Sequence, residues 1–282
     1  MYDVVIIGAG PAGVAAAIQL KRSGHRLCVV ESAEIGGLLH HAHCVENYPG
    51  FATGLHGKVL AQRLEAHLNR FNVEIHRQAV TGLTRSDQWL CVHTPSAVFE
   101  ARYVIAATGT QPRKWCDFDL PSGVEKRIFY DPREAAKVDG DIVIIGGGDA
   151  AFDYALRLAG TREVIIIHRH APRALPLLVR RVDAHGMIRR YQGGTVRSIE
   201  TDSKELAVIG TEETVRASAV VIAIGRVPDT RFLGADAADW KREPRLYWAG
   251  DVINERYRQA VIAAGDGLRT AMKISERLEG NV

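Results

Sequence analysis

Apolar runs of four or five residues alternate with helix-like patterns over much of the chain. The run Val4–Ile7 consists of β-branched residues and predicts a strand, and the apolar stretch Val14–Leu20 predicts a helix shortly after it. Arg26–Val30 predicts the next strand. Because strands that alternate with helices form parallel sheets, this pattern predicts an α/β fold.

The same order of elements returns in the middle of the chain. Ile142–Ile145 predicts a buried strand, Ala150–Ala159 a helix and Val164–Ile167 another strand. The other predicted elements are a helix over Leu55–Phe71, strands at Val73–Ile75, Val80–Leu83, Leu90–His93 and Tyr103–Ala106, and a closing helix over Ala260–Leu278. The pattern therefore indicates an internal repeat at the scale of a domain.

A glycine-rich turn, Gly8–Gly13, joins the first strand to the first helix. In the pattern Gly-x-Gly-x-x-Gly, the first glycine permits a tight turn and the second lets a pyrophosphate approach the backbone. The third allows the helix to pack closely on the strand. Glu31 follows the second strand, where a carboxylate accepts a hydrogen bond from a ribose. This combination predicts a site for one dinucleotide.

A second glycine-rich turn, Gly146–Ala151, occupies the same place in the second repeat. The strand that follows ends at His168, Arg169 and His170, with Arg173 close behind, rather than at an acidic residue. Guanidinium groups pair with a 2′-phosphate, which a carboxylate would repel. The second site therefore favours NADPH over NADH, with a solvated basic loop as the alternative. Two sites in one chain predict a tightly held flavin that exchanges electrons with a nicotinamide.

The two repeats predict three segments. Residues 1–112 form the first part of a flavin domain, 113–226 an inserted nicotinamide domain, and 227–282 the second part of the flavin domain. Two features connect the tail with the first segment. Asp251 follows an apolar strand, and the helix that opens at Arg258–Ala260 directs its N-terminus at a reduced flavin.

Composition narrows the class of protein. The chain has 282 residues, of which 46% are hydrophobic and 24% charged, as expected for a globular protein of about two domains. A net charge of +3 is too small to indicate nucleic-acid binding, and no apolar run outside the first strand and helix is long enough for membrane insertion. The four cysteines, at 28, 44, 91 and 116, have neither metal nor disulfide spacing, which favours the reducing cytoplasm.

Positive charge is concentrated in one part of the second repeat. Seven arginines lie from Arg169 to Arg197, against the single acid Asp183. Four of those not assigned to the nucleotide form either a docking face for an acidic protein or a solvated surface. These four are Arg180, Arg181, Arg189 and Arg190.

Several short motifs together resemble the low-molecular-weight thioredoxin reductase family. They are the two glycine-rich turns, Gly36–Gly37, Glu46–Gly50, Ala107–Gly109, Ala249–Asp251 and Arg258–Ala260. The resemblance covers nearly the whole chain. It implies two Rossmann-like dinucleotide-binding domains, FAD and NADPH as cofactors, and a homodimer.

The resemblance also implies which residues contact each cofactor. FAD is expected at Gly8, Gly10, Pro11, Ala12, Gly13, Glu31, Gly37, Leu38, Asn47, Val80, Ala107, Thr108, Gly109, Gly250, Asp251, Arg258, Gln259 and Ala260. NADPH is expected at Gly146, Gly148, Asp149, Ala150, His168, Arg169, Arg173, Ile224 and Gly225.

One departure from the family concerns the redox dithiol. Thioredoxin reductases carry a CxxC before the second glycine-rich turn, whereas Phe129–Glu134 contains no cysteine. We therefore expect no disulfide exchange with thioredoxin. The expected acceptor is an electron carrier of the ferredoxin or flavodoxin type, as in the ferredoxin/flavodoxin–NADP⁺ reductases of the same fold. The alternatives are a small-molecule disulfide, peroxide or quinone-like acceptor, and a non-catalytic flavin-binding sensor.

Cys44 is the candidate catalytic side chain. It follows Gly36–Gly37 at the spacing where lipoamide dehydrogenases and NADH peroxidases hold a cysteine beside the flavin. It is therefore expected either as a thiol that takes electrons from the flavin or as an incidental cysteine. His40, His41 and His43 lack the spacing of a metal site, and one of them is expected to handle a proton.

Overall fold

The computed structural model describes residues 1–115, 120–160, 162–202, 205–210 and 213–280, so the cysteine at 116 lies outside the described residues. The chain divides into two compact units. Unit 1 comprises Met1–His40, Val45–Gln111 and Val227–Val282. Unit 2 comprises His41–Cys44 and Pro112–Arg226. The segment 41–44, which we expected within the first half, thus belongs by its contacts to unit 2.

Unit 1 is built on a mixed sheet with the strand order β3-β2-β1-β6-β5-β4, and β17 also pairs with β6. The strands are β1 (Tyr2–Ile7), β2 (Leu27–Val30), β3 (Glu74–His76), β4 (Gly82–Arg85), β5 (Leu90–His93), β6 (Val98–Ala106) and β17 (Leu246–Trp248). β1 lies parallel to β2, as their strand–helix–strand connection requires, and is also parallel to β6. β4 and β5 continue the sheet in antiparallel order.

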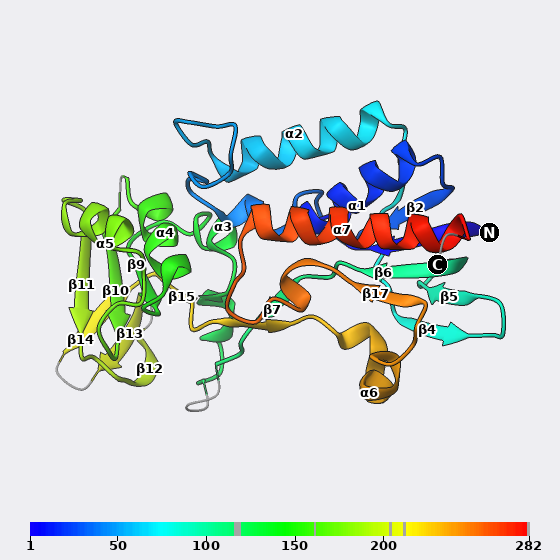
Figure 1. Cartoon of the computed structure of the whole chain (residues 1–282). Helices are drawn as coiled ribbons and strands as arrows, with labels where there is room; N and C mark the ends of the chain where they lie inside the picture. Colours follow the sequence, from blue (N-terminus) through cyan, green and yellow to red (C-terminus); the bar gives the residue numbers. More distant parts are fainter. Residues whose placement is uncertain (116–119, 161, 203–204, 211–212, 281–282) are drawn as a thin grey trace. The chain divides into compact units, whose positions relative to one another are not determined.

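Three longer helices belong to unit 1: α1 (Pro11–Arg22), α2 (Gly57–Arg70) and α7 (Ala260–Leu278). Shorter pieces are η1 (Gly37–His41), whose last residue belongs to unit 2, η3 (Arg231–Asp236), α6 (Ala237–Trp240) and η4 (Gly250–Val252). The C-terminal helix α7 packs along α1, its red ribbon beside the blue one in Figure 1. A glycine permits this close approach, since a Cβ on Gly267 would lie 2.0 Å from the carbonyl oxygen of Ala12.

Unit 2 contains a parallel sheet with the order β11-β10-β9-β15-β8. Its strands are β8 (Ile128–Phe129), β9 (Ile142–Ile145), β10 (Val164–His168), β11 (Ile188–Gln192) and β15 (Ala219–Ile222). Its other elements are η2 (Glu125–Arg127), α3 (Pro132–Ala135), α4 (Asp149–Leu158), α5 (Pro176–Asp183), and the antiparallel strands β12 (Val196–Asp202), β13 (Glu205–Gly210) and β14 (Thr214–Ala217). The two connections between the units pair with each other as β7 (Thr110–Pro112) and β16 (Arg226–Pro228).

The predicted α/β class with two dinucleotide-binding folds is confirmed. Several strands start one or two residues from the predicted position, and β6 differs most, since it begins at Val98 rather than Tyr103. The first half of β6 pairs antiparallel with β5 and alternates between exposed and buried residues, so it lacks an apolar run. Within the described residues, we find no helix long and apolar enough to cross a membrane.

Candidate functional site

The first glycine-rich turn lies between β1 and α1 and is shaped by two crowded glycines. A Cβ on Gly8 would lie 2.4 Å from the carbonyl oxygen of Ala107, and one on Gly13 would lie 1.9 Å from that of Gly8. A Cβ on Gly10, in contrast, would have no atom within 4 Å. The turn is therefore packed on its inner side and open at its middle glycine, the position where a pyrophosphate needs to reach the backbone.

Glu31 lies next to this turn. One carboxylate oxygen accepts the backbone N–H of Ala9 at 2.6 Å, and the other accepts that of Ala33 at 2.7 Å. Gly37 approaches the same place, since a Cβ on it would lie 3.5 Å from Cα of Gly10. The acidic group expected to hold a ribose is thus oriented by the backbone of the loop that would hold the phosphates.

The tail of the chain brings further FAD candidates into unit 1. Gly250 lies against α1, where a Cβ on it would be 2.7 Å from Cβ of Ala12. Gln259 is the N-cap residue of α7, and its side-chain oxygen accepts a hydrogen bond from the Asn47 amide at 2.9 Å. The structure thus joins two predicted residues that lie 212 positions apart, at the positive end of a 19-residue helix.

The remaining FAD candidates belong to several elements of unit 1. Thr108 donates its hydroxyl to the carbonyl oxygen of Asp229 at 2.6 Å, which anchors the turn after β6 to the start of the tail. Leu38 is half-buried in η1, and Val80 packs beside the core between β3 and β4. The other candidates, placed by their elements, are Pro11 at the first position of α1, Gly109 before β7, Asp251 in η4, Arg258 before α7 and Ala260 at its first position.

The second glycine-rich turn repeats the geometry of the first in unit 2. A Cβ on Gly146 would lie 2.3 Å from the carbonyl oxygen of Ala223, and a Cβ on Gly148 would have no atom within 4 Å. Gly148 caps α4, whose first residue Asp149 accepts the backbone N–H of Leu175 at 2.7 Å. Both turns therefore fit a pyrophosphate at the start of a helix.

The basic loop after β10 contains one buried residue that supports the loop and two exposed arginines. His168 is buried, and its Nδ1 lies 2.7 Å from the carbonyl oxygen of His170, so this imidazole supports the loop from inside. The backbone N–H of Arg173 donates to the carbonyl oxygen of Gly147 at 2.7 Å. The Arg169 and Arg173 side chains are exposed, which leaves both guanidinium groups accessible to a phosphate.

The other NADPH candidates surround the same turn. Ala150 is exposed in the first turn of α4, and Ile224 packs beside the core after β15. Gly225 has a φ of 114°, and its carbonyl oxygen accepts the backbone N–H of Arg113 at 3.0 Å.

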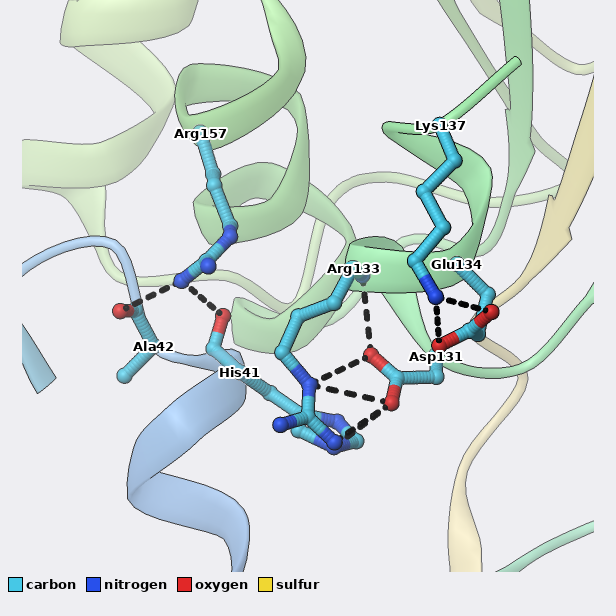
Figure 2. A network of polar contacts seen from close by, with 7 residues as sticks. All are labelled: His41, Ala42, Asp131, Arg133, Glu134, Lys137 and Arg157. Carbon is cyan, nitrogen blue, oxygen red and sulfur yellow. Dashed lines mark hydrogen bonds and ion pairs between the residues drawn. The ribbon is translucent and has the colours of Figure 1, made fainter. Parts of the chain in front are cut away.

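The segment that carries Cys44 is held by residues of unit 2 that the motifs did not indicate. Arg157 of α4 donates to the carbonyl oxygens of Ala42 at 3.2 Å and His41 at 3.4 Å (Figure 2). Asp153, one helical turn earlier, accepts the backbone N–H of His43 at 2.7 Å. An acid and an arginine four residues apart are common on exposed helices, so local sequence offers no signal for these contacts.

Asp131 lies in Phe129–Glu134, the segment that has no cysteine where the resemblance leads one to expect the dithiol. It caps α3 by accepting the backbone N–H of Arg133 at 2.8 Å, and it forms an ion pair with the Arg133 guanidinium at 2.8 Å (Figure 2). Nε2 of His41 lies 3.4 Å from the same carboxylate. Burial nevertheless lowers the pKa of His41 to about 4, and nearby arginines act in the same direction. The imidazole is therefore neutral at physiological pH.

The arginine-rich face is partly neutralised. Arg189 pairs with Glu163 at 2.8 Å, and Arg190 pairs with Asp183 at 3.1 Å. Two of the four arginines expected to dock an acidic carrier are thus engaged within unit 2, which weakens the argument for that partner.

Comparison with known proteins identifies the relatives of this architecture. Residues 2–272 match the sequence model of the family described as pyridine nucleotide-disulphide oxidoreductase. The chain is 31% identical to a thioredoxin reductase of Mycolicibacterium smegmatis over 95% of this chain and 93% of the relative. It is 32% identical to a thioredoxin reductase of Streptomyces coelicolor over 96% and 92%. The crystal structure of Lactococcus lactis thioredoxin reductase superposes with a TM-score of 0.85 at 28% identity, over 99% of this chain and all of that one.

These findings confirm the resemblance and correct the expected acceptor. FAD and NADPH are the cofactors, and the two open glycine turns fit them. The expectation of a ferredoxin or flavodoxin acceptor is wrong, because the relatives that match nearly the whole chain are named thioredoxin reductases. Our exclusion of thioredoxin treated a dithiol within this chain as indispensable, although a single thiol is able to start disulfide exchange.

Proposed function

We propose, from the premise that the chain belongs to the pyridine nucleotide-disulphide oxidoreductase family, that it reduces a disulfide of the thioredoxin type with electrons from NADPH. The observation that carries this proposal is the identity of 31% to a reductase of that name over 95% of this chain. The balanced reaction is NADPH, a proton and one disulfide giving NADP⁺ and two thiols. We also propose that the protein acts as a homodimer, which light scattering tests.

The chain's own residues hold and orient the two nucleotides. In unit 1 the open backbone at Gly10 and the N-terminus of α1 face the pyrophosphate of FAD, with Glu31 at its ribose. In unit 2, Gly148 and α4 do the same for NADPH, and Arg169 and Arg173 bind its 2′-phosphate. Bound FAD supplies the two-electron chemistry that connects nicotinamide and thiol.

Cys44 is the thiol that we assign to the acceptor. The sequence has no CxxC, and Phe129–Glu134, where the family holds one, contains the Asp131–Arg133 ion pair instead. Cys28 is unsuitable, because burial raises the pKa of its thiol to about 12. Cys44 is only partly buried and follows Gly36–Gly37 at the spacing of a flavin-side cysteine.

The proposed exchange begins when the Cys44 thiolate attacks one sulfur of the acceptor disulfide. A bond forms from Sγ of Cys44 to that sulfur, the acceptor's S–S bond breaks, and the second acceptor sulfur leaves as a thiolate and takes up a proton. Two electrons that originate from NADPH then cleave the mixed disulfide. With the uptake of one proton, this restores the Cys44 thiolate and releases the acceptor sulfur that was attacked as a thiol.

The test is NADPH-dependent reduction of oxidised bacterial thioredoxin by the FAD-loaded protein. We expect turnover by the wild type and a loss of at least about 100-fold in Cys44→Ser, because the remaining hydroxyl cannot form the mixed disulfide. Cys91→Ser, at a half-buried cysteine in β5, is the matched control and retains wild-type turnover. Reduction of the flavin by NADPH continues in both variants.

Two results count against the proposal in different ways. Failure of the wild type to reduce thioredoxin refutes the acceptor. Full activity of Cys44→Ser refutes the thiol route and leaves the acceptor in place.

A further inference from the structure

The short segment His41–Cys44 is bound by unit 2 almost entirely through its backbone. Arg157 donates to two consecutive carbonyl oxygens, those of His41 and Ala42, at 3.4 and 3.2 Å (Figure 2). Asp153 accepts the backbone N–H of His43 at 2.7 Å, and the backbone N–H of Cys44 also donates to it. The positively charged Arg157 therefore binds carbonyl oxygens, and the negatively charged Asp153 binds N–H groups. Each side chain meets the end of the peptide dipole that carries the opposite partial charge.

The placement of these two side chains follows from helix geometry. Asp153 and Arg157 are four residues apart on α4, so they project from one face of the helix, one turn after the other. The neighbours Phe152, Ala155 and Leu158 are buried in the core of unit 2, which fixes the helix beneath them. Both groups therefore present their charges from a rigid support.

A further contact holds the start of the segment. The His41 imidazole lies 3.4 Å from the Asp131 carboxylate, whose own position is set by the Arg133 guanidinium (Figure 2). The segment is thus bound at its first residue by a side-chain contact and along its length by backbone hydrogen bonds. Its last residue is Cys44.

We propose that Asp153 and Arg157 form a backbone clamp that positions Cys44 for disulfide exchange, an inference that rests on the proposed function of Cys44. Neither residue touches the acceptor; both act through the backbone they hold. A thiol at the end of an ordered segment reacts with the acceptor disulfide without the entropic cost of first ordering that segment. Because the clamp binds only backbone groups, it does not depend on which side chains the segment carries.

The clamp is tested on the FAD-loaded protein by hydrogen exchange and by thiol alkylation. Arg157→Met removes the donors and keeps the aliphatic stem, and Asp153→Asn removes the charge and keeps one oxygen. We expect the amides of His43 and Cys44, which donate to Asp153, to lose at least about tenfold in protection (about 1.4 kcal/mol) in both variants, since each loosens the same segment. We also expect iodoacetamide to alkylate Cys44 at least about threefold faster.

The matched control is Arg162→Met. Arg162 also donates to backbone carbonyls in unit 2, those of Val138 and Ala136, but away from the 41–44 segment. We expect this variant to keep wild-type exchange at His43 and Cys44 and wild-type reduction of thioredoxin. In Arg157→Met we expect kcat with thioredoxin to fall about tenfold, with NADPH reduction of the flavin unchanged.

The outcomes separate the clamp from the function on which it rests. Unchanged exchange at His43 and Cys44 in both clamp variants overturns the clamp, whatever the turnover. Increased exchange with unchanged thioredoxin reduction overturns its positioning role. Turnover of the wild type decides the acceptor and turnover of Cys44→Ser decides the role of the thiol, since the clamp holds backbone groups that this variant does not change.

Discussion

The two middle glycines offer a direct test of the nucleotide sites, and Gly148 of the second turn is the better one to change. Its backbone has φ −101° and ψ 178°, which an alanine adopts without strain, and an added Cβ would meet no atom within 4 Å. Gly148→Ala should therefore leave the unfolding free energy within about 0.5 kcal/mol of wild type. Its effect should appear only when a ligand approaches the backbone.

The expected loss of affinity follows from the space that the new methyl group would occupy. Crowding of one methyl group against a closely packed partner costs about 1–3 kcal/mol, which corresponds to an increase of about 5- to 150-fold in the Kd for NADPH. The assay follows flavin reduction at increasing NADPH concentrations, with FAD content and thermal unfolding measured on the same preparations.

Gly146→Ala is the matched comparison. Its Cβ would lie 2.3 Å from the carbonyl oxygen of Ala223, so this variant should destabilise unit 2 by about 2 kcal/mol or more, with or without nucleotide. If Gly148→Ala binds NADPH within about twofold of wild type, the assignment of this turn to the pyrophosphate is refuted. Loss of stability in Gly148→Ala would contradict the open space at this position.

Three further predictions concern the charged and titrating groups. The double variant Arg169→Ala and Arg173→Ala should raise the KM for NADPH by at least about 100-fold and the KM for NADH by less than about threefold, since only NADPH carries the 2′-phosphate. Steady-state assays measure both constants, and equal increases would refute the assignment of these arginines to the phosphate. His41 has its pKa lowered to about 4, so between about pH 4 and 6.5 the unfolded chain binds a proton that the folded one does not. Its contribution to the unfolding free energy should therefore rise with pH by about 3 kcal/mol across this window, at about 1.4 kcal/mol per pH unit. Urea unfolding of His41→Gln should lack that rise, and a curve parallel to wild type would contradict the buried neutral imidazole. Gly10→Ala should fold but retain less than about a tenth of the wild-type FAD, measured by absorbance after gel filtration, and full FAD content would rule out close approach at Gly10.

The sequence by itself determined the elements that depend on near neighbours. The predicted closing helix matches α7 over Ala260–Leu278, and the apolar run Ile142–Ile145 matches β9. The two glycine turns were also predictable, because the conformation of a strand–turn–helix unit depends on about six adjacent residues. Where one face of a strand is exposed, as in the first half of β6, the apolar run is missing and the predicted strand is too short.

Only the tertiary structure decided which distant groups meet. Asn47 reaches Gln259 across 212 positions, and Asp153 reaches the backbone of His43 across 110. His168, which looks like a ligand of the nucleotide in the sequence, is buried and supports its loop from within. Such contacts depend on the path of the whole backbone and on burial, which no local pattern encodes.

The same limit explains the error about the acceptor. The missing CxxC and the arginine-rich stretch are local features, and they led to a carrier protein of the wrong class. In the folded chain two of those arginines are paired with Glu163 and Asp183, and the segment that ends in Cys44 is held by Asp153 and Arg157. The roles of these arginines and of the Cys44 thiol depend on the groups that lie beside them in the folded chain. An ion pair or a hydrogen bond forms between neighbours in space, whatever their separation in sequence.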